Sequence, residues 1–82
     1  MDYKFFDISD RTISFNFSDN IDQIINSKIV EISFEINKKR NHFDIVACYP
    51  TYNSLVIDYD PINIERNVII NRISELIDNF EF

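Results

Sequence analysis

The sequence contains no glycine among its 82 residues. Loops that cradle phosphates or dinucleotides need glycine, because it combines positive φ with close approach of the backbone to the ligand. Its absence therefore excludes the glycine-rich nucleotide-binding loops from this chain. Tight turns have to rely on Asn and Asp, which tolerate the left-handed conformation best among the other residues.

Cysteine is nearly absent as well, since Cys48 is the single one. One cysteine forms no internal disulfide and supplies no cysteine cluster for zinc. Four acidic residues of the N-terminal part have neither the spacing nor the glycine of a calcium loop. These acids are Asp7, Asp10, Asp19 and Asp22. We therefore expect no metal site.

Basic residues are few, with 8 Lys and Arg against 14 Asp and Glu, and the formal net charge is −6. Binding to nucleic acid requires clustered cations that displace counterions, and adhesion to an anionic membrane requires a similar patch. The one basic cluster is Lys38, Lys39 and Arg40. We expect neither nucleic-acid binding nor membrane adhesion.

Long hydrophobic runs are also missing. A membrane-spanning helix needs about 18 or more consecutive apolar residues, and the N-terminal MDYKFFDISD intersperses charges among its apolar residues, unlike a signal peptide. We expect a cytoplasmic protein. Residues 1–82 are short enough for one domain, and an apolar share of 45% suffices for one core.

Four segments have strand patterns. Residues 3–8 are rich in aromatics, and residues 12–17 alternate strictly, with Ile13, Phe15 and Phe17 on one face. Residues 45–49 are apolar, and residues 54–59 alternate until Asp60-Pro61 ends the run, because proline donates no ladder hydrogen bond. Turns are predicted at 9–11 and 51–53 and a loop at 41–44.

Two segments have the spacing of amphipathic helices. The first follows the candidate caps Ser18, Asp19 and Asn20, and Asn63 is the candidate cap of the second. The apolar stripe of the first is Ile21, Ile24, Ile25, Ile29, Ile32 and Ile36, and that of the second is Ile69, Ile70, Ile73, Leu76, Ile77 and Phe80.

Residues 29–36 carry a competing pattern, since IVEISFEI also alternates and is rich in β-branched residues. We favour helix, because the helical spacing is sustained from Ile21 and Lys38 to Arg40 follow where the helix dipole prefers cations. In that case Val30 and Phe34 lie off the main stripe and are partly exposed.

The predicted fold class is α+β. The order ββαββα gives a two-layer sandwich, a four-stranded antiparallel sheet with both helices on one face. The other sheet face is expected to carry residues such as Tyr3 or Phe5, Val56 and part of 45–49. It is either open to water or covered by a partner, and an open face with aromatics favours an interaction surface.

Two pairs of side chains raise the question of catalysis. Asp58 and Asp60 share a strand face by their spacing, but Asp60 precedes a proline that leads into a helix, where an acid is favourable. Cys48 and His42 suggest a thiol–imidazole pair, but Cys48 lies in an apolar strand and His42 in a polar loop. We interpret all four as structural and expect no catalytic, cofactor-binding or metal-binding residue.

The segment from Pro50 to Pro61 does resemble a known family. It reads Pro50-x-Tyr52-x-Ser54-Leu55-x-Ile57-x-Tyr59-Asp60-Pro61, similar to a signature P-x-Y-x-S-L-x-V-x-Y-D-P. That signature occurs in the N-terminal domain of the family that comprises allophanate hydrolase subunit 1, a 5-oxoprolinase subunit and the KipI-type histidine-kinase inhibitors. Asp10-x-Thr12-Ile13-x-Phe15-x-Phe17 and the helix opening Ile21, Ile25-Asn26, Ile29 resemble further parts of its pattern.

The sequence also departs from the family pattern. Ser9 and Ala47 stand where the family often has glycine and glutamate, and a glycine before the third strand is missing. We expect the family's cyclophilin-like C-terminal domain to be absent from this chain. The resemblance implies a ββαββα domain whose motif residues are structural or face a partner. These motif residues are Asp10, Pro50, Tyr52, Ser54, Tyr59, Asp60 and Pro61.

Two functions follow from the resemblance as expectations. The first is a domain of a 5-oxoprolinase subunit that is inactive alone and contributes, with companion subunits, to ATP-dependent hydrolysis of 5-oxoproline. ATP is then a cofactor of the whole assembly and not of this domain. The second is a binding module that inhibits a sensor histidine kinase through its phosphotransfer domain.

Overall fold

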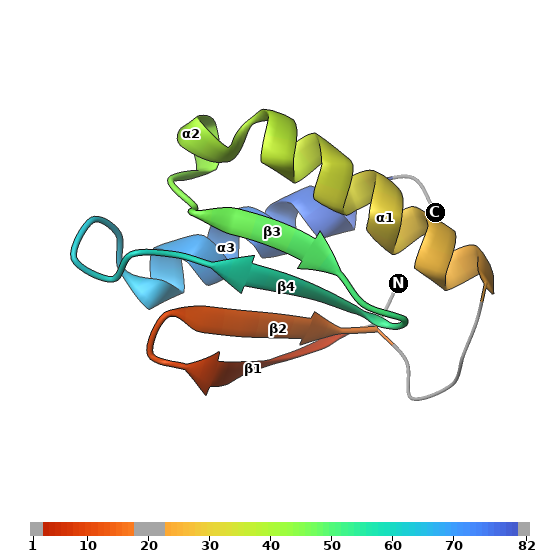
Figure 1. The fold of residues 1–82 in the computed structure, drawn as a ribbon, viewed down its shortest axis with the longest axis horizontal. Helices are drawn as coiled ribbons and strands as arrows, with labels where there is room; N and C mark the ends of the chain where they lie inside the picture. The colour runs from red at the N-terminus through yellow and green to blue at the C-terminus, as the bar shows by residue number, and fades with distance from the viewer. Residues whose placement is uncertain (1–2, 18–22, 81–82) are drawn as a thin grey trace.

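The computed structural model describes residues 3–17 and 23–80. The elements follow the order β1 (Lys4–Ser9), β2 (Thr12–Asn16), α1 (Gln23–Lys38), α2 (Arg40–Phe43), β3 (Ala47–Pro50), β4 (Ser54–Asp58) and α3 (Arg66–Asn79). All strand pairs are antiparallel in one sheet of order β1-β2-β4-β3. Figure 1 shows α3 behind the strands of this sheet and α1 running along its β3 side. The predicted α+β class and two-layer sandwich are confirmed.

The core lies between the sheet and the two long helices. Ile13 and Phe15 of β2 are fully buried, as are Leu55 and Ile57, which pair with them in β4. The α1 and α3 residues that pack into the same core are Ile29, Ile32, Ile36, Ile69, Ile70, Ile73 and Ile77. Each fully buried side chain of this size contributes about 1.5–3 kcal/mol. The alternation of the strands and the helical spacing of isoleucine therefore produce one joint core.

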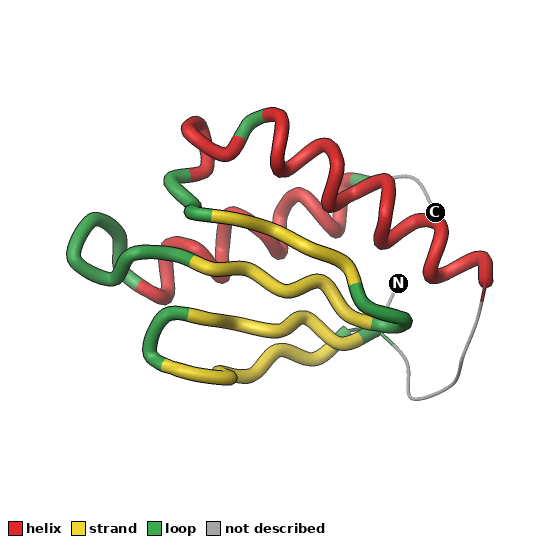
Figure 2. Tube along the Cα trace, in the orientation of Figure 1, coloured by secondary structure: helices red, strands yellow, loops and turns green. Residues whose placement is uncertain are grey.

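Helix α1 settles the competing prediction for residues 29–36 in favour of helix (Figure 2). Val30 and Phe34 are exposed, as the helical interpretation predicts, and the Lys38 ammonium lies 5.1 Å from the centre of the Phe34 ring. The assignment of Ile24 to the buried stripe was wrong, since 74% of its surface is exposed. Ser18, Asp19, Asn20 and Ile21 lie outside the described residues.

Three other local predictions need correction. Residues 41–44 do not form a plain loop, because α2 covers most of them before Asp44 turns the chain with φ of 59°. That positive φ falls on an aspartate, as expected in a chain without glycine. The N-cap of α3 is Glu65, without a side-chain bond, and Asn63 instead donates its side-chain amide to Asp60.

The third correction concerns the uncovered sheet face. Tyr3 and Phe5 belong to the helix side, because their rings lie 5.9 Å from the centre of the Phe15 ring. Side chains alternate along a strand, so Phe6 is the aromatic that β1 presents on the opposite face. The predictions that Val56 and part of the third strand lie on that face are correct, as the register with Tyr49 shows.

Candidate binding surface

The uncovered face of the sheet carries a row of side chains that crosses all four strands. Phe6 of β1 pairs with Ser14 of β2, Ser14 pairs with Val56 of β4, and Val56 pairs with Tyr49 of β3. The outer members are large and exposed, 49% for Phe6 and 43% for Tyr49, whereas Ser14 and Val56 are buried between them. The face therefore has small central residues flanked by two aromatic rings, a shape that suits an apolar partner.

Asp58 anchors the polar end of this face. Its Oδ1 accepts a hydrogen bond from the Thr12 hydroxyl at 2.7 Å, and its Oδ2 accepts one from the Tyr49 hydroxyl. The hydrogen bond to Asp58 is the main cause that raises the pKa of Tyr49, because losing the phenolic proton would leave two negative oxygens in contact. Tyr49 is therefore held in place as a neutral hydrogen-bond donor on the exposed face.

A shallow depression of about 400 Å³ adjoins Asp58 at this end of the sheet. Its lining consists of Ser9, Arg11, Thr12, Val46, Asp58, Tyr59 and Asp60. Strand β4 ends at Asp58, so Asp60 lies in the following turn. Asp60 Oδ1 accepts the Ile62 N–H at 3.0 Å, and Oδ2 accepts the Asn63 side-chain amide at 3.3 Å. Both carboxylates thus make the contacts of a strand and its exit turn, and their lack of a catalytic role stays a prediction.

A comparison with known protein families identifies a family that matches this chain. The family described as "Carboxyltransferase domain, subdomain C and D" matches residues 3–81. The chain belongs to this family. Searches of curated proteins and of solved structures found no match.

In this carboxyltransferase C/D subdomain, the motif residues expected to be structural or partner-facing divide between the two ends of the sheet. Pro50, Tyr52 and Ser54 lie at the β3–β4 turn, where the Asn26 side chain of α1 donates to the carbonyls of Thr51 and Tyr52 at 3.1 and 3.3 Å. The Asn26 amide therefore ties the start of α1 to this turn. Pro50 and Tyr52 are exposed there, and Ser54 is buried.

The other motif residues lie at the opposite end of the subdomain. Asp10 occupies the exposed β1–β2 turn, and the neighbouring Arg11 carbonyl accepts the Tyr59 N–H at 3.0 Å. Tyr59 is buried and precedes the turn made by Asp60 and Pro61. These contacts join the first hairpin to the exit of β4. The structure brings Asp10, Tyr59 and Asp60 together at one end of the sheet. Pro50, Tyr52 and Ser54 lie at the other end, and within the described part of the chain the two groups share no contacts.

Cys48 and His42 occupy different surroundings in the subdomain. Cys48 is a buried member of the core, and burial raises the pKa of its thiol to about 12, so the thiol stays protonated near neutrality. His42 lies exposed on α2, with its ring edge-on to Phe43 at 5.4 Å between centroids. Within residues 3–17 and 23–80, no three His, Cys, Asp or Glu residues gather as metal ligands. No helix in this part of the chain has the length and apolarity to cross a membrane.

Sequence reasoning missed two sets of polar contacts around the sheet. The Thr12–Asp58–Tyr49 cluster joins three strands, and only the register brings these residues together. Asn37 of α1 was not noticed either, although its side chain bonds both backbone groups of Cys48. A polar residue one position after Ile36, at the edge of the apolar stripe, is the signal that could have indicated such a contact.

Proposed function

We propose that this carboxyltransferase C/D subdomain is a non-catalytic docking domain of a 5-oxoprolinase subunit, similar to the protein called allophanate hydrolase subunit 1. In this role it contributes to ATP-dependent hydrolysis of 5-oxoproline by holding companion subunits together. The single observation that carries the proposal is the uncovered sheet face with Phe6 and Tyr49 at its flanks. The family match and the motif from Pro50 to Pro61 support the choice of enzyme class.

The chemistry of the described residues supports docking over catalysis. Asp58 and Asp60 are engaged in hydrogen bonds within the fold, and the Cys48 thiol is buried and protonated. A nucleophile needs an adjacent base and an orienting group, and His42 packs on Phe43 instead. ATP and the reacting groups are therefore assigned to the companion subunits.

Reconstitution tests this function. The chain is mixed with the companion 5-oxoprolinase subunits, and release of glutamate is measured with and without ATP. We expect turnover that depends on both ATP and the chain. Equal turnover without the chain contradicts the proposal.

A matched pair of variants then locates the docking face. Phe6→Glu places a charge on the uncovered face, and Phe34→Glu places the same charge on the outer side of α1, where 63% of the phenylalanine is exposed. We expect Phe6→Glu to reduce turnover at least about tenfold, since a charge buried in an interface without a partner costs several kcal/mol, and Phe34→Glu to leave it within about twofold. The reverse order would place the interface on the helix layer.

The uncovered face also favours a second function. A sheet face with small central residues accommodates a helix, because helices and sheets pack in layers. We propose as the alternative that the chain binds the helical phosphotransfer domain of a sensor histidine kinase and blocks its autophosphorylation. Unchanged kinase autophosphorylation at a saturating concentration of the chain would exclude this alternative.

A further inference from the structure

The hydrogen bonds at the sheet end reveal which backbone groups of β1 point away from the sheet. The Tyr59 N–H donates to the Arg11 carbonyl at 3.0 Å, so these two residues form a hydrogen-bonded pair. The next pair along the two strands, Thr12 and Asp58, is therefore a non-hydrogen-bonded pair. Hydrogen-bonded and non-hydrogen-bonded pairs alternate along the ladder. Every second residue of β2 from Thr12 on therefore turns its N–H and C=O toward β1. In the register of β1 with β2, the residues opposite these positions are Lys4 and Phe6, whose N–H and C=O groups therefore point toward β2.

The backbone groups of Phe5 and Asp7 then point outward from the edge of the sheet. The opposite edge has the corresponding groups on Cys48 of β3, and there Asn37 binds both of them. The Asn37 side-chain amide donates to the Cys48 carbonyl at 2.6 Å, and its oxygen accepts the Cys48 N–H at 3.0 Å. The outward groups of Phe5 and Asp7 have no such partner within the described ranges. One edge of the sheet is thus blocked by a side chain, and the other is open.

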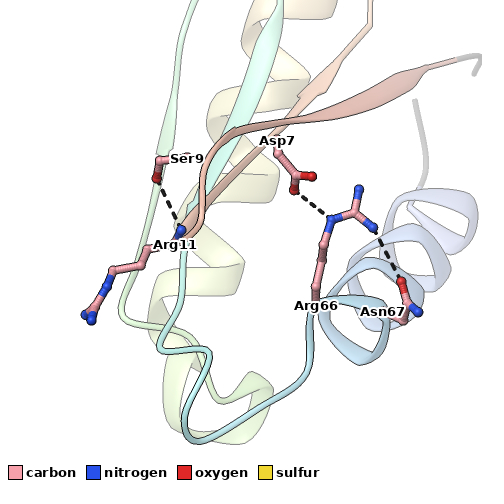
Figure 3. Close-up of polar contacts among 5 residues, drawn as sticks. All are labelled: Asp7, Ser9, Arg11, Arg66 and Asn67. Atoms are coloured by element: carbon pink, nitrogen blue, oxygen red, sulfur yellow. Dashed lines mark hydrogen bonds and ion pairs between the residues drawn. The ribbon is translucent and has the colours of Figure 1, made fainter.

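The side chains beside the open edge define what fits it. Phe5 and Phe6 are exposed on opposite faces of β1, so an added strand meets an aromatic ring on each side. Figure 3 shows Asp7 bound to Arg66, whose Nε lies 2.7 Å from Oδ1, with no bond drawn to the second carboxylate oxygen. The register shift between Asp7 and Ser9 ends the regular edge. The accepting stretch is therefore residues 4–7.

We propose that this edge accepts an extended segment of a partner protein as an additional antiparallel strand, with a lysine or arginine opposite Asp7 and an apolar residue opposite Phe5. The net charge of −6 and the second oxygen of Asp7 favour a basic segment. A second copy fits poorly. It leaves Asp7 without an opposing cation in each symmetric register: pairing about Phe6 sets Asp7 opposite Phe5, pairing about Asp7 opposes two carboxylates, and pairing about Phe5 sets Asp7 opposite Tyr3. The inference goes beyond the proposed function and holds for any partner that supplies such a strand.

A peptide titration tests the inference with the full chain. The probe is the acetylated and amidated peptide threonine-lysine-valine-isoleucine-threonine-lysine, added to isotope-labelled protein and followed by amide shifts and hydrogen exchange in NMR spectra. We expect shifts and slower exchange at the Phe5 and Asp7 amides and no change at Cys48. The same peptide with both lysines replaced by glutamate should bind about fivefold more weakly. No response at Phe5 and Asp7, or self-association through β1 without peptide, overturns the proposal.

A pair of substitutions at one position separates the backbone bond from the side chain. Phe5→Pro removes an outward N–H without removing a bond to β2, whereas Phe5→Val removes the same ring and keeps the N–H. We expect Phe5→Pro to bind the peptide at least about fivefold more weakly than Phe5→Val, and equal affinities contradict the inference. Circular dichroism checks that both variants fold. If Phe5→Pro does not, the peptide N-methylated at its isoleucine removes the reciprocal bond of the same pair, from the isoleucine N–H to the Phe5 carbonyl of the wild-type protein, and unchanged affinity is again the contrary result.

Discussion

Replacement of Asn37 by alanine tests how the sheet is closed at β3. The Asn37 side chain makes two bonds to the Cys48 backbone, at 2.6 and 3.0 Å, and Cys48 is 3% exposed. Each bond contributes about 0.5–1.5 kcal/mol net, so the pair contributes about 1–3 kcal/mol. Alanine favours the helix by about 0.5 kcal/mol over asparagine, which offsets part of the loss. We expect Asn37→Ala to lower the free energy of unfolding by about 0.5–2.5 kcal/mol.

Urea unfolding followed by circular dichroism measures this loss, and Asn71→Ala is the matched control. Asn71 is exposed on α3 and its side chain has no bond to another described residue, so its replacement carries the same change in helix propensity without a lost contact. We expect the control to be neutral or slightly stabilising. If Asn37→Ala and Asn71→Ala unfold at the same urea concentration, water replaces Asn37 at the β3 edge and the reasoning about the blocked edge is refuted.

Three further outcomes follow from the structure. Because Phe15 is fully buried, Phe15→Ala should lower the free energy of unfolding in urea by about 3–5 kcal/mol. This is a large part of the roughly 4–12 kcal/mol typical of a domain this size, and a loss below about 1 kcal/mol would contradict the assigned core. Asp7→Asn should change stability by less than about 1 kcal/mol, since the Asp7–Arg66 pair is about half exposed, and a larger loss would mean that the pair holds α3 to β1. Burial raises the pKa of the Cys48 thiol from 9.0 to about 12, so between these pH values the folded protein keeps a proton that the unfolded chain loses. The contribution of Cys48 to the free energy of unfolding is therefore fully present below pH 9 and declines between pH 9 and 12. The urea midpoint of Cys48→Ala should fall less over this pH range than that of the wild type, and parallel pH profiles would contradict the prediction.

The layers of the fold were predictable because the hydrophobic pattern is regular. Ile13 and Phe15 alternate in β2, and the isoleucines of α3 recur at helical spacing, so the buried faces follow directly. Residues 29–36 were ambiguous by pattern alone, and their helical state depends on continuity with the preceding turn of α1. Ile24 was assigned to the same stripe but is exposed, because it lies about 100° around the helix from Ile25, which packs against the core.

The candidate surface was harder to predict, because it depends on strand register and strand order. Asp58 was correctly interpreted as part of a strand, but its two partners come from β2 and β3, and the sequence contains no signal that pairs them. Phe5 and Phe6 are adjacent aromatics, and alternation alone leaves open which one faces the core. The ring contact of Phe5 with Phe15 decides this in favour of Phe6 on the uncovered face.

Protection of that face in the assembled complex is the most direct test of the docking role. Hydroxyl-radical footprinting compares oxidation of Phe6 and Tyr49 with that of Phe34, before and after the companion 5-oxoprolinase subunits are added. All three side chains are exposed in the free chain, at 49%, 43% and 63%. We expect oxidation of Phe6 and Tyr49 to fall several-fold while that of Phe34 is unchanged. Unchanged oxidation of Phe6 and Tyr49 in an active assembly would contradict docking through the uncovered sheet.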